Sequence, residues 1–225
     1  MRPITDYIPK PLVPVRNVPV LEWQIRHLLR FGIREIVLCT GYKTGMIADR
    51  LRAKDFGAHV TISAEEVPLG TGGAIRQAAR HIGGDNSFVV LNGDIITDID
   101  IDRLVRARNA IATIPLRTNY GILDVDGDDD DSGSPRAITR FREKGSIPGM
   151  WMNAGIYHLG RETLNELPVV GDIEKTLFPK YAQAGRLGAV RFGERGGDKT
   201  IWQSIDSFKD LEACEEMLAK AGGNM

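Results

Sequence analysis

The fold is decided by one short stretch, Ser87-Phe88-Val89-Val90-Leu91-Asn92-Gly93-Asp94, in which an apolar run ends in polar residues and glycine. The apolar part is typical of a β-strand, and Asn92-Gly93-Asp94 follows the carboxyl end of that strand. Open α/β sheets place their ligand-contacting groups at this end of the strands. The stretch therefore predicts a strand of an α/β sheet and, directly after it, a turn able to contact a ligand.

The sequence before this stretch alternates between helical and extended patterns. Leu21–Phe31 carries apolar residues at helical spacing, whereas Glu35–Thr40 is a short apolar run with β-branched members, typical of a strand covered on both faces. The same reasoning predicts helices over Met46–Leu51 and Gly72–His81 and a strand over His59–Ser63. This alternation predicts a mostly parallel sheet with helices on both sides.

The second half of the chain is less regular. Ala110–Leu116 and Ala137–Arg142 flank an acidic, glycine-containing run and predict a hairpin. The remaining predicted elements are a strand over Asn153–Leu159, a helix over Asp172–Ala184, an edge strand over Gly188–Phe192 and a closing helix over Phe208–Ala221. Neither a repeat nor a linker divides the chain, so we expect a single domain over residues 1–225.

The composition indicates an ordinary globular protein. Among 225 residues, 42% are hydrophobic and 26% are charged, and the net charge of -1 provides no field that would attract nucleic acid or an anionic membrane. The sequence contains neither an apolar run of the roughly 18 residues that a spanning helix needs nor a signal-peptide pattern, so we expect a cytoplasmic protein. Cys39 and Cys214 lie far apart in apolar patterns and are interpreted as reduced packing residues.

Two aspartates end extended segments. Asp94 closes the decisive stretch, and Asp206 lies in Trp202-Gln203-Ser204-Ile205-Asp206-Ser207, just before the closing helix. Each aspartate has a purely structural interpretation as the cap of a helix. If the fold brings them together, the pair suits Mg²⁺, which takes one or two carboxylates and leaves its other positions to water and phosphate.

A glycine-rich segment, Leu69-Gly70-Thr71-Gly72-Gly73-Ala74, follows a predicted strand and opens a predicted helix. Its backbone N–H groups and the helix dipole are suited to an anion or a base edge. A dinucleotide-dependent oxidoreductase is one alternative, but Ile75 stands where the third glycine of that fingerprint belongs. A test of NADH binding checks the oxidoreductase alternative, which absence of binding would exclude.

Three further motifs carry polar groups that contact phosphates or hydroxyls in many proteins. Lys10 lies between Pro9 and Pro11, which restrict its backbone, and Glu143-Lys144 ends a predicted strand. Asn153-Ala154-Gly155 combines an amide with two small residues, which permits close approach of a ligand or simply tight packing. Taken singly, the lysine and the charged strand end are equally consistent with solvated surface positions.

In order, these pieces resemble the sugar-1-phosphate nucleotidyltransferase family. Residues 2–15, Arg-Pro-Ile-Thr-Asp-Tyr-Ile-Pro-Lys-Pro-Leu-Val-Pro-Val, resemble the second half of the family's signature. The other matching motifs follow in the family's order over nearly the whole chain: Leu69–Ala74, Asn92–Asp94, Tyr120-Gly121, Phe141–Lys144, Asn153–Gly155 and Trp202–Ser207.

The resemblance implies a Rossmann-like, three-layered α/β fold with a mixed, mostly parallel sheet, as in glycosyltransferase-A-like nucleotide-diphospho-sugar transferases. The implied reaction is in-line attack of a sugar 1-phosphate on the α-phosphate of an NTP (CTP, UTP, dTTP or GTP). By similarity, Lys10 contacts the phosphates, and Asp94 and Asp206 hold Mg²⁺. The resemblance places the nucleotide against Leu69, Gly70, Thr71, Gly72 and Gly93. It also implies a sugar-binding region of roughly residues 110–200, in which the sugar phosphate binds Gly121, Glu143, Lys144 and Asn153. A homo-oligomer is compatible with the sequence.

Two departures from the family pattern matter. The family begins with an apolar strand and a glycine-rich loop ending in Gly-Thr-Arg, and here Met1 stands just after the place of that Arg. We expect an N-terminally truncated chain. The alternative is a catalytically impaired relative that binds sugar nucleotides in a regulatory or scaffolding role.

The second departure concerns the nucleotide. Trp202 precedes Asp206 by four residues, and this spacing, like Cys39-Thr40-Gly41-Tyr42-Lys43, resembles the glucose-1-phosphate cytidylyltransferase branch, which makes CTP a candidate.

Overall fold

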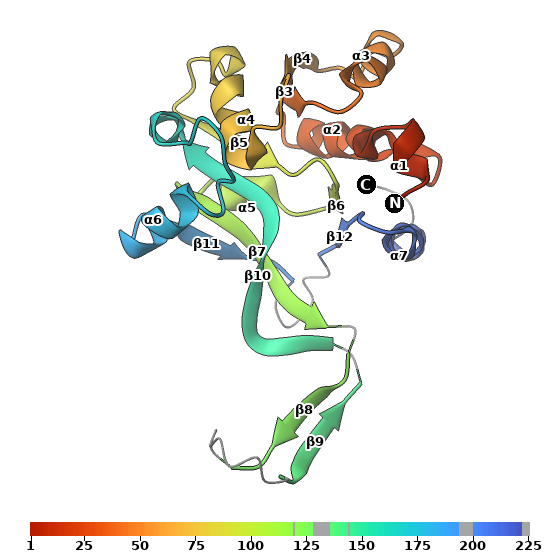
Figure 1. Ribbon diagram of the computed structural model, residues 1–225, viewed down its shortest axis with the longest axis vertical. Helices are drawn as coiled ribbons and strands as arrows, with labels where there is room; N and C mark the ends of the chain where they lie inside the picture. Colours follow the sequence, from red (N-terminus) through yellow and green to blue (C-terminus); the bar gives the residue numbers. More distant parts are fainter. Residues whose placement is uncertain (119, 128–135, 144, 194–199, 222–225) are drawn as a thin grey trace.

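The computed structural model describes residues 1–118, 120–127, 136–143, 145–193 and 200–221 (Figure 1). Its α-helices are α1 (Ile4–Tyr7), α2 (Val20–Arg30), α3 (Thr44–Arg52), α4 (Gly70–Ala78), α5 (Ile101–Leu104), α6 (Leu177–Gln183) and α7 (Phe208–Lys220), and short 3₁₀ turns cover Lys10–Leu12, Ala79–His81 and Arg161–Asn165. Its strands are β1 (Pro14–Val15), β2 (Val18–Pro19), β3 (Glu35–Thr40), β4 (His59–Ala64), β5 (Ser87–Leu91), β6 (Ile95–Thr97), β7 (Ala110–Thr118), β8 (Ile122–Val125), β9 (Ile138–Arg142), β10 (Gly145–Gly160), β11 (Gly188–Arg191) and β12 (Trp202–Ser204).

The largest sheet has the strand order β11-β7-β10-β5. β11 runs parallel to β7, but β10 lies antiparallel to both β7 and β5. A separate parallel pair joins β3 to β4. The expected mixed α/β architecture is confirmed, but parallel pairing does not predominate among the described strands, because the long strand β10 inserts between β5 and β7 in the opposite direction.

Helices cover both faces of this sheet at β10, where successive side chains point in opposite directions. Tyr157 and Leu159 pack into a cluster with residues of α4 and α6, including Ile75 and Phe178. Ile156 packs on the other face, in a cluster that includes residues of α5. The sheet is therefore the middle of three layers, as expected.

A cleft of about 1410 Å³ separates β3 from β5 and is lined by every residue of both strands. In the described part of the chain, β3 pairs only with β4 and β5 only with β10, so the edges of β3 and β5 at the cleft are unpaired. Apolar side chains of α2 and α4, among them Ile25 and Ile75, also line the cleft. The sheet that the sequence suggests as continuous is thus divided in two.

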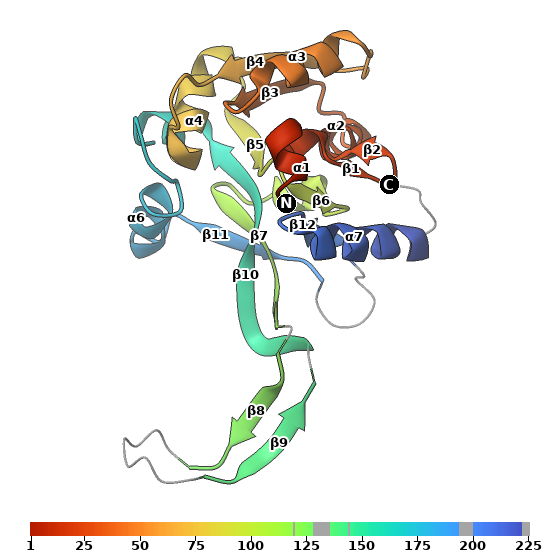
Figure 2. The same ribbon diagram turned by 45° about the vertical axis from the view of Figure 1, so that its right-hand side comes forward.

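β8 and β9 form an arm that projects from the rest of the molecule in both views (Figures 1 and 2). The two strands pair antiparallel, with Leu123 opposite Phe141, and both of these side chains are exposed. Ala137–Arg142 supplies one strand of a hairpin, as predicted, but the predicted partner was wrong: β9 pairs with β8, whereas Ala110–Leu116 belongs to β7, which pairs with β10 and β11 in the main sheet.

The helix expected over Asp172–Ala184 begins only at Leu177. The segment before it is held instead by the start of α4, since Ile173 N–H donates to the Thr71 hydroxyl and Gly171 N–H donates to Leu69 O. Within the described residues, no helix combines the length and apolar character that crossing a membrane requires.

Candidate active site

Pairing of β6 with β12 brings the two predicted aspartates together. Ser204 lies opposite Ile95 in this antiparallel pair, and Ile205 N–H extends it by donating to Asp94 O at 2.8 Å. Asp94 is the residue before β6, and Asp206 comes two residues after β12. Two carboxylates that lie 112 positions apart in the chain therefore meet at one end of a two-stranded ladder.

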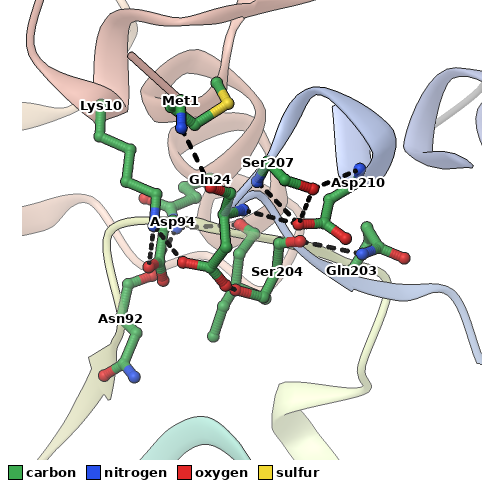
Figure 3. Close-up of polar contacts among 11 residues, drawn as sticks. Met1, Lys10, Gln24, Asn92, Asp94, Gln203, Ser204, Ser207 and Asp210 are labelled. Atoms are coloured by element: carbon green, nitrogen blue, oxygen red, sulfur yellow. Dashed lines mark hydrogen bonds and ion pairs between the residues drawn. The ribbon is translucent and has the colours of Figure 1, made fainter. Parts of the chain in front are cut away.

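Lys10 contacts both carboxylates, and Figure 3 shows its side chain reaching Asp94. Its Nζ is 2.8 Å from Asp94 Oδ2 and 2.6 Å from Asp206 Oδ1. Partial burial lowers the pKa of Lys10, but hydrogen bonds and charges from Asp206 and Asp94 outweigh burial and raise it above its ordinary value. The same contact from Lys10, followed by one from Ser204, lowers the pKa of Asp206. At neutral pH, Lys10 and Asp206 are therefore both held in their charged forms.

The structure decides against the helix-cap interpretation of both aspartates. α7 is capped by Ser207, whose hydroxyl accepts from Asp210 N–H while the Asp210 carboxylate accepts from Ser207 N–H. Asp94 precedes strand β6 and not a helix. Neither carboxylate therefore caps a helix, and both contact Lys10.

Gln24 holds the Asn92–Asp94 turn in place and was not singled out from the sequence. Its Nε2 donates to Asn92 O at 2.7 Å and to Ile95 O at 2.9 Å, so it bridges the two ends of the turn. The side chain is buried on α2 together with Leu21 and Ile25. In the sequence, this role of Gln24 is indicated by its amide on the apolar face of a predicted amphipathic helix.

Five of the predicted residues border the cleft between β3 and β5: Lys10, Gly70, Thr71, Gly93 and Asp94. The cluster of charged groups and the glycine-rich segment therefore open onto a common space. Leu69 and Gly72 belong to the same segment, at the start of α4.

The start of α4 is bound to the segment around Gly171, which sequence analysis did not identify. Gly72 N–H and Gly73 N–H both donate to Gly171 O, so these groups already have partners within the protein. Gly70 adopts φ +74°, and a Cβ there would lie 2.7 Å from the Gly171 carbonyl carbon. Glycine at position 70 is thus required by close packing against Gly171, whatever the segment binds.

The predicted sugar-binding residues divide into two groups. Asn153, on β10, donates through Nδ2 to the Tyr157 hydroxyl and accepts from Gly155 N–H. Gly121 and Glu143 adjoin the arm strands, and Gly121 lies against the Phe141 ring. The arm projects away from β6 and β12, whose ends carry Asp94 and Asp206 (Figure 2). Lys144 lies outside the described residues.

The donor set suits a magnesium ion. Asp94 and Asp206 offer carboxylate oxygens, and the Lys10 ammonium, in contact with both, shows that they converge on a single position for positive charge. Two carboxylates are what Mg²⁺ takes when phosphates supply further ligands. Among the described residues, no group of three or more His, Cys, Asp or Glu side chains forms a self-sufficient metal site.

A model of the nucleotidyl transferase family matches residues 1–175. The chain belongs to this family. Among curated relatives of this chain, mannose-1-phosphate guanyltransferase 2 of Candida glabrata is 34% identical over 226 residues, covering 95% of this chain and 60% of the relative. D-glycero-alpha-D-manno-heptose 1-phosphate guanylyltransferase of Campylobacter jejuni is 31% identical over 187 residues, covering 81% and 79%.

The fold has a solved counterpart. The crystal structure of HddC from Yersinia pseudotuberculosis complexed with GMP-PN superposes with a TM-score of 0.70 and 24% identity, covering 96% of this chain and 93% of that one. This likeness shows that the two chains share a fold. The chain spans about three fifths of the length of the Candida glabrata relative.

The expected nearness to cytidylyltransferases is not supported, because the curated relatives named above are guanylyltransferases. Of the residues behind that interpretation, Trp202 donates through Nε1–H to Ala154 O, and Lys43 Nζ donates to the backbone carbonyls of Asp6 and Tyr7. The others, residues 39–42, line the cleft.

Proposed function

We propose that this chain catalyses Mg²⁺-dependent transfer of a guanylyl group from GTP to a sugar 1-phosphate, forming a GDP-sugar and pyrophosphate. The observation that carries the proposal is the convergence of Lys10, Asp94 and Asp206 at the cleft that Gly70 and Thr71 also border. The names of relatives that match most of this chain support GTP as the nucleotide.

A sugar with the manno configuration is the proposed acceptor. Both curated relatives described above carry it in their names, one as mannose and one as manno-heptose. The sugar would bind along β10 at Asn153. Roles in sugar binding for Gly121, Glu143 and Lys144 stay predictions from the sequence.

The proposed chemistry is an in-line displacement. An oxygen of the sugar 1-phosphate forms a bond to the α-phosphorus of GTP, the bond from that phosphorus to the β-phosphate oxygen breaks, and pyrophosphate leaves with the electron pair. Such a reaction requires positioning and charge neutralisation and no covalent nucleophile. Bound Mg²⁺, held by Asp94 and Asp206, would neutralise phosphate charge, and Lys10 would exchange its carboxylate partners for phosphate oxygens.

An additional apolar strand between β3 and β5 belongs to the same proposal. Two unpaired strand edges beside apolar side chains are costly, and one inserted strand would satisfy both and join the divided sheet. Fusing a β-branched strand of about six residues and a glycine-rich loop ahead of Met1 should raise the melting temperature and protect β3 and β5 amides from exchange. The same gain from a Gly/Ser extension would contradict this part.

A sugar-nucleotide-binding protein without turnover is the second candidate. The open cleft favours it, as does the arm beside Gly121 and Glu143, which projects away from β6 and β12 (Figure 2). Such a protein would bind GTP or GDP-mannose and release no pyrophosphate.

Release of pyrophosphate separates these candidates. The protein is incubated with GTP, mannose 1-phosphate and Mg²⁺, with CTP, UTP and dTTP in parallel and EDTA as the blank. We expect GTP-dependent release that is abolished by EDTA and reduced at least 100-fold in Asp94→Asn, a loss of the size seen when one transition-state contact is removed. GTP binding without release would support the second candidate, and absence of both binding and release would refute the proposed function.

A further inference from the structure

Glu174 occupies a central place between the two sides of the proposed site. Its Oε2 accepts from the Thr71 hydroxyl at 2.6 Å, and its Oε1 accepts from the Tyr157 hydroxyl at 3.0 Å. The side chain belongs to the segment before α6 and is half-buried. In the part of the chain that the structure describes, no Lys, Arg or His forms an ion pair with the Glu174 carboxylate. Its side-chain hydrogen bonds there come from the hydroxyls of Thr71 and Tyr157.

The contact to Thr71 reaches the glycine-rich segment. Residues Leu69–Gly73 of this segment, which comprise the N-cap and first turn of α4, are called the nucleotide loop. The Thr71 hydroxyl also accepts from Ile173 N–H at 2.9 Å, so it is held by residues directly before and at position 174. Gly171 N–H donates to Leu69 O at 2.7 Å in the same region. The orientation of the nucleotide loop therefore depends on the segment that carries Glu174.

The contact to Tyr157 reaches the sugar side. The Tyr157 hydroxyl accepts from Asn153 Nδ2 at 3.0 Å, and Asn153 Oδ1 accepts from Gly155 N–H at 2.7 Å. Tyr157 is fully buried and meets the Phe178 ring edge-on with centroids 4.8 Å apart. Burial raises the pKa of its phenol, which stays protonated and donates its hydrogen to Glu174.

We propose that Glu174 is a positioning residue, which fixes the nucleotide loop and Asn153 relative to each other through Thr71 and Tyr157. This inference rests on the proposed function, since it takes the nucleotide loop and Asn153 as the two substrate sides. The connection runs from one hydroxyl through one carboxylate to a second hydroxyl and then to an amide. No step of it involves the Lys10 cluster.

Removal of the carboxylate has a defined consequence. In Glu174→Ala, the buried Tyr157 hydroxyl and the Thr71 hydroxyl both lose their acceptor, so both substrate sides are held less firmly, although Thr71 keeps its contact with Ile173 N–H. Each substrate must then pay for ordering its own side on binding. We expect KM for GTP and for mannose 1-phosphate to rise roughly tenfold each, with kcat changed less than about threefold, because the reacting groups are untouched.

Glu166→Ala is the matched control. Glu166 also accepts from the hydroxyl of a fully buried tyrosine, Tyr181, at 2.8 Å, but it contacts neither the nucleotide loop nor β10. It should lower the melting temperature and leave both KM values unchanged. If Glu174 were merely structural, its variant would behave like this control.

A double-mutant cycle tests the route of the coupling. Thr71→Val and Tyr157→Phe each remove one hydroxyl from Glu174, and each should raise both KM values in the unmodified protein. In the Glu174→Ala background each should have a smaller effect, limited to the contacts with Ile173 N–H and Asn153 that do not involve Glu174. Full additivity in that background would overturn the inference.

Hydrogen exchange supplies a readout that needs no substrate. Glu174→Ala should speed exchange of amides in the nucleotide loop and at residues 153–157, whereas Glu166→Ala should not. Unchanged protection in both segments would overturn the inference even if the protein is active. Conversely, absence of GTP binding by the unmodified protein refutes the proposed function and the substrate role of Glu174, while exchange still shows whether the two segments are joined.

Discussion

Substitution of Lys10 by methionine separates the cost to stability from the cost to activity. Methionine keeps the length and apolar stem of the side chain but removes the charge between Asp94 and Asp206. The two ion pairs are partly exposed, with side-chain accessibilities of 30% for Lys10, 30% for Asp94 and 65% for Asp206. Such pairs contribute about 0.5 kcal/mol each after screening by solvent, so we expect a loss of about 1 kcal/mol in the free energy of unfolding.

The expected loss of activity is much larger. A cation that neutralises charge on the transferred phosphate contributes about 3 kcal/mol to transition-state stabilisation, which corresponds to a fall in kcat of roughly 100-fold or more. Urea unfolding measures the first quantity and GTP-dependent pyrophosphate release the second. Lys180→Met is the control, because Lys180 also forms a 2.6 Å ion pair, with Glu166, away from the cluster.

The reasoning is refuted if Lys10→Met retains more than a tenth of the activity while losing several kcal/mol of stability, since Lys10 would then be a structural ion-pair residue. The acid limb gives a second check. The pKa of Asp206 lies below 3.8 chiefly because Lys10 donates to it, so its contribution to stability is present above about pH 4 and is lost as pH falls through the folded-state pKa. Lys10→Met should remove that part of the acid dependence.

Three further predictions concern stability and use urea unfolding. Burial, followed by the charge of Arg30, lowers the pKa of His27 to about 4, so stability should fall by about 3 kcal/mol as pH drops from 6.5 to 4; His27→Leu should abolish that slope, and an unchanged slope would contradict this account. Ser207→Ala should cost about 1 kcal/mol through loss of the α7 cap, and no loss would mean that the capping box is dispensable. Gly70→Ala should cost more than about 1 kcal/mol, because its Cβ meets the Gly171 backbone at positive φ; a stabilised variant would disprove the close approach.

Local patterns in the sequence predicted the helices and strands that bury one face or both faces in a regular period. α2, β3, β5, β9 and α7 lie where periodicity and apolar runs placed them. The start of α6 was wrong by five residues, because Asp172–Thr176 is held by contacts with Thr71 and Leu69 that no local pattern encodes. The prediction of a mostly parallel sheet was wrong for the same reason. The direction of β10 depends on its pairing with β5 and β7, which no local pattern encodes.

The sequence by itself determined the chemical types present at the site: a lysine fixed near prolines, two aspartates at the ends of extended segments, and a glycine-rich helix start. Only the tertiary structure decided that Asp94 and Asp206 meet at Lys10, through the pairing of β6 with β12. It also revealed Gln24 and Glu174, whose contacts with Asn92 and Thr71 join residues 68 and 103 positions apart. Side-chain periodicity reports the face that a segment buries, whereas the identity of its partner depends on backbone pairing between distant segments, which leaves no periodic signal in either of them.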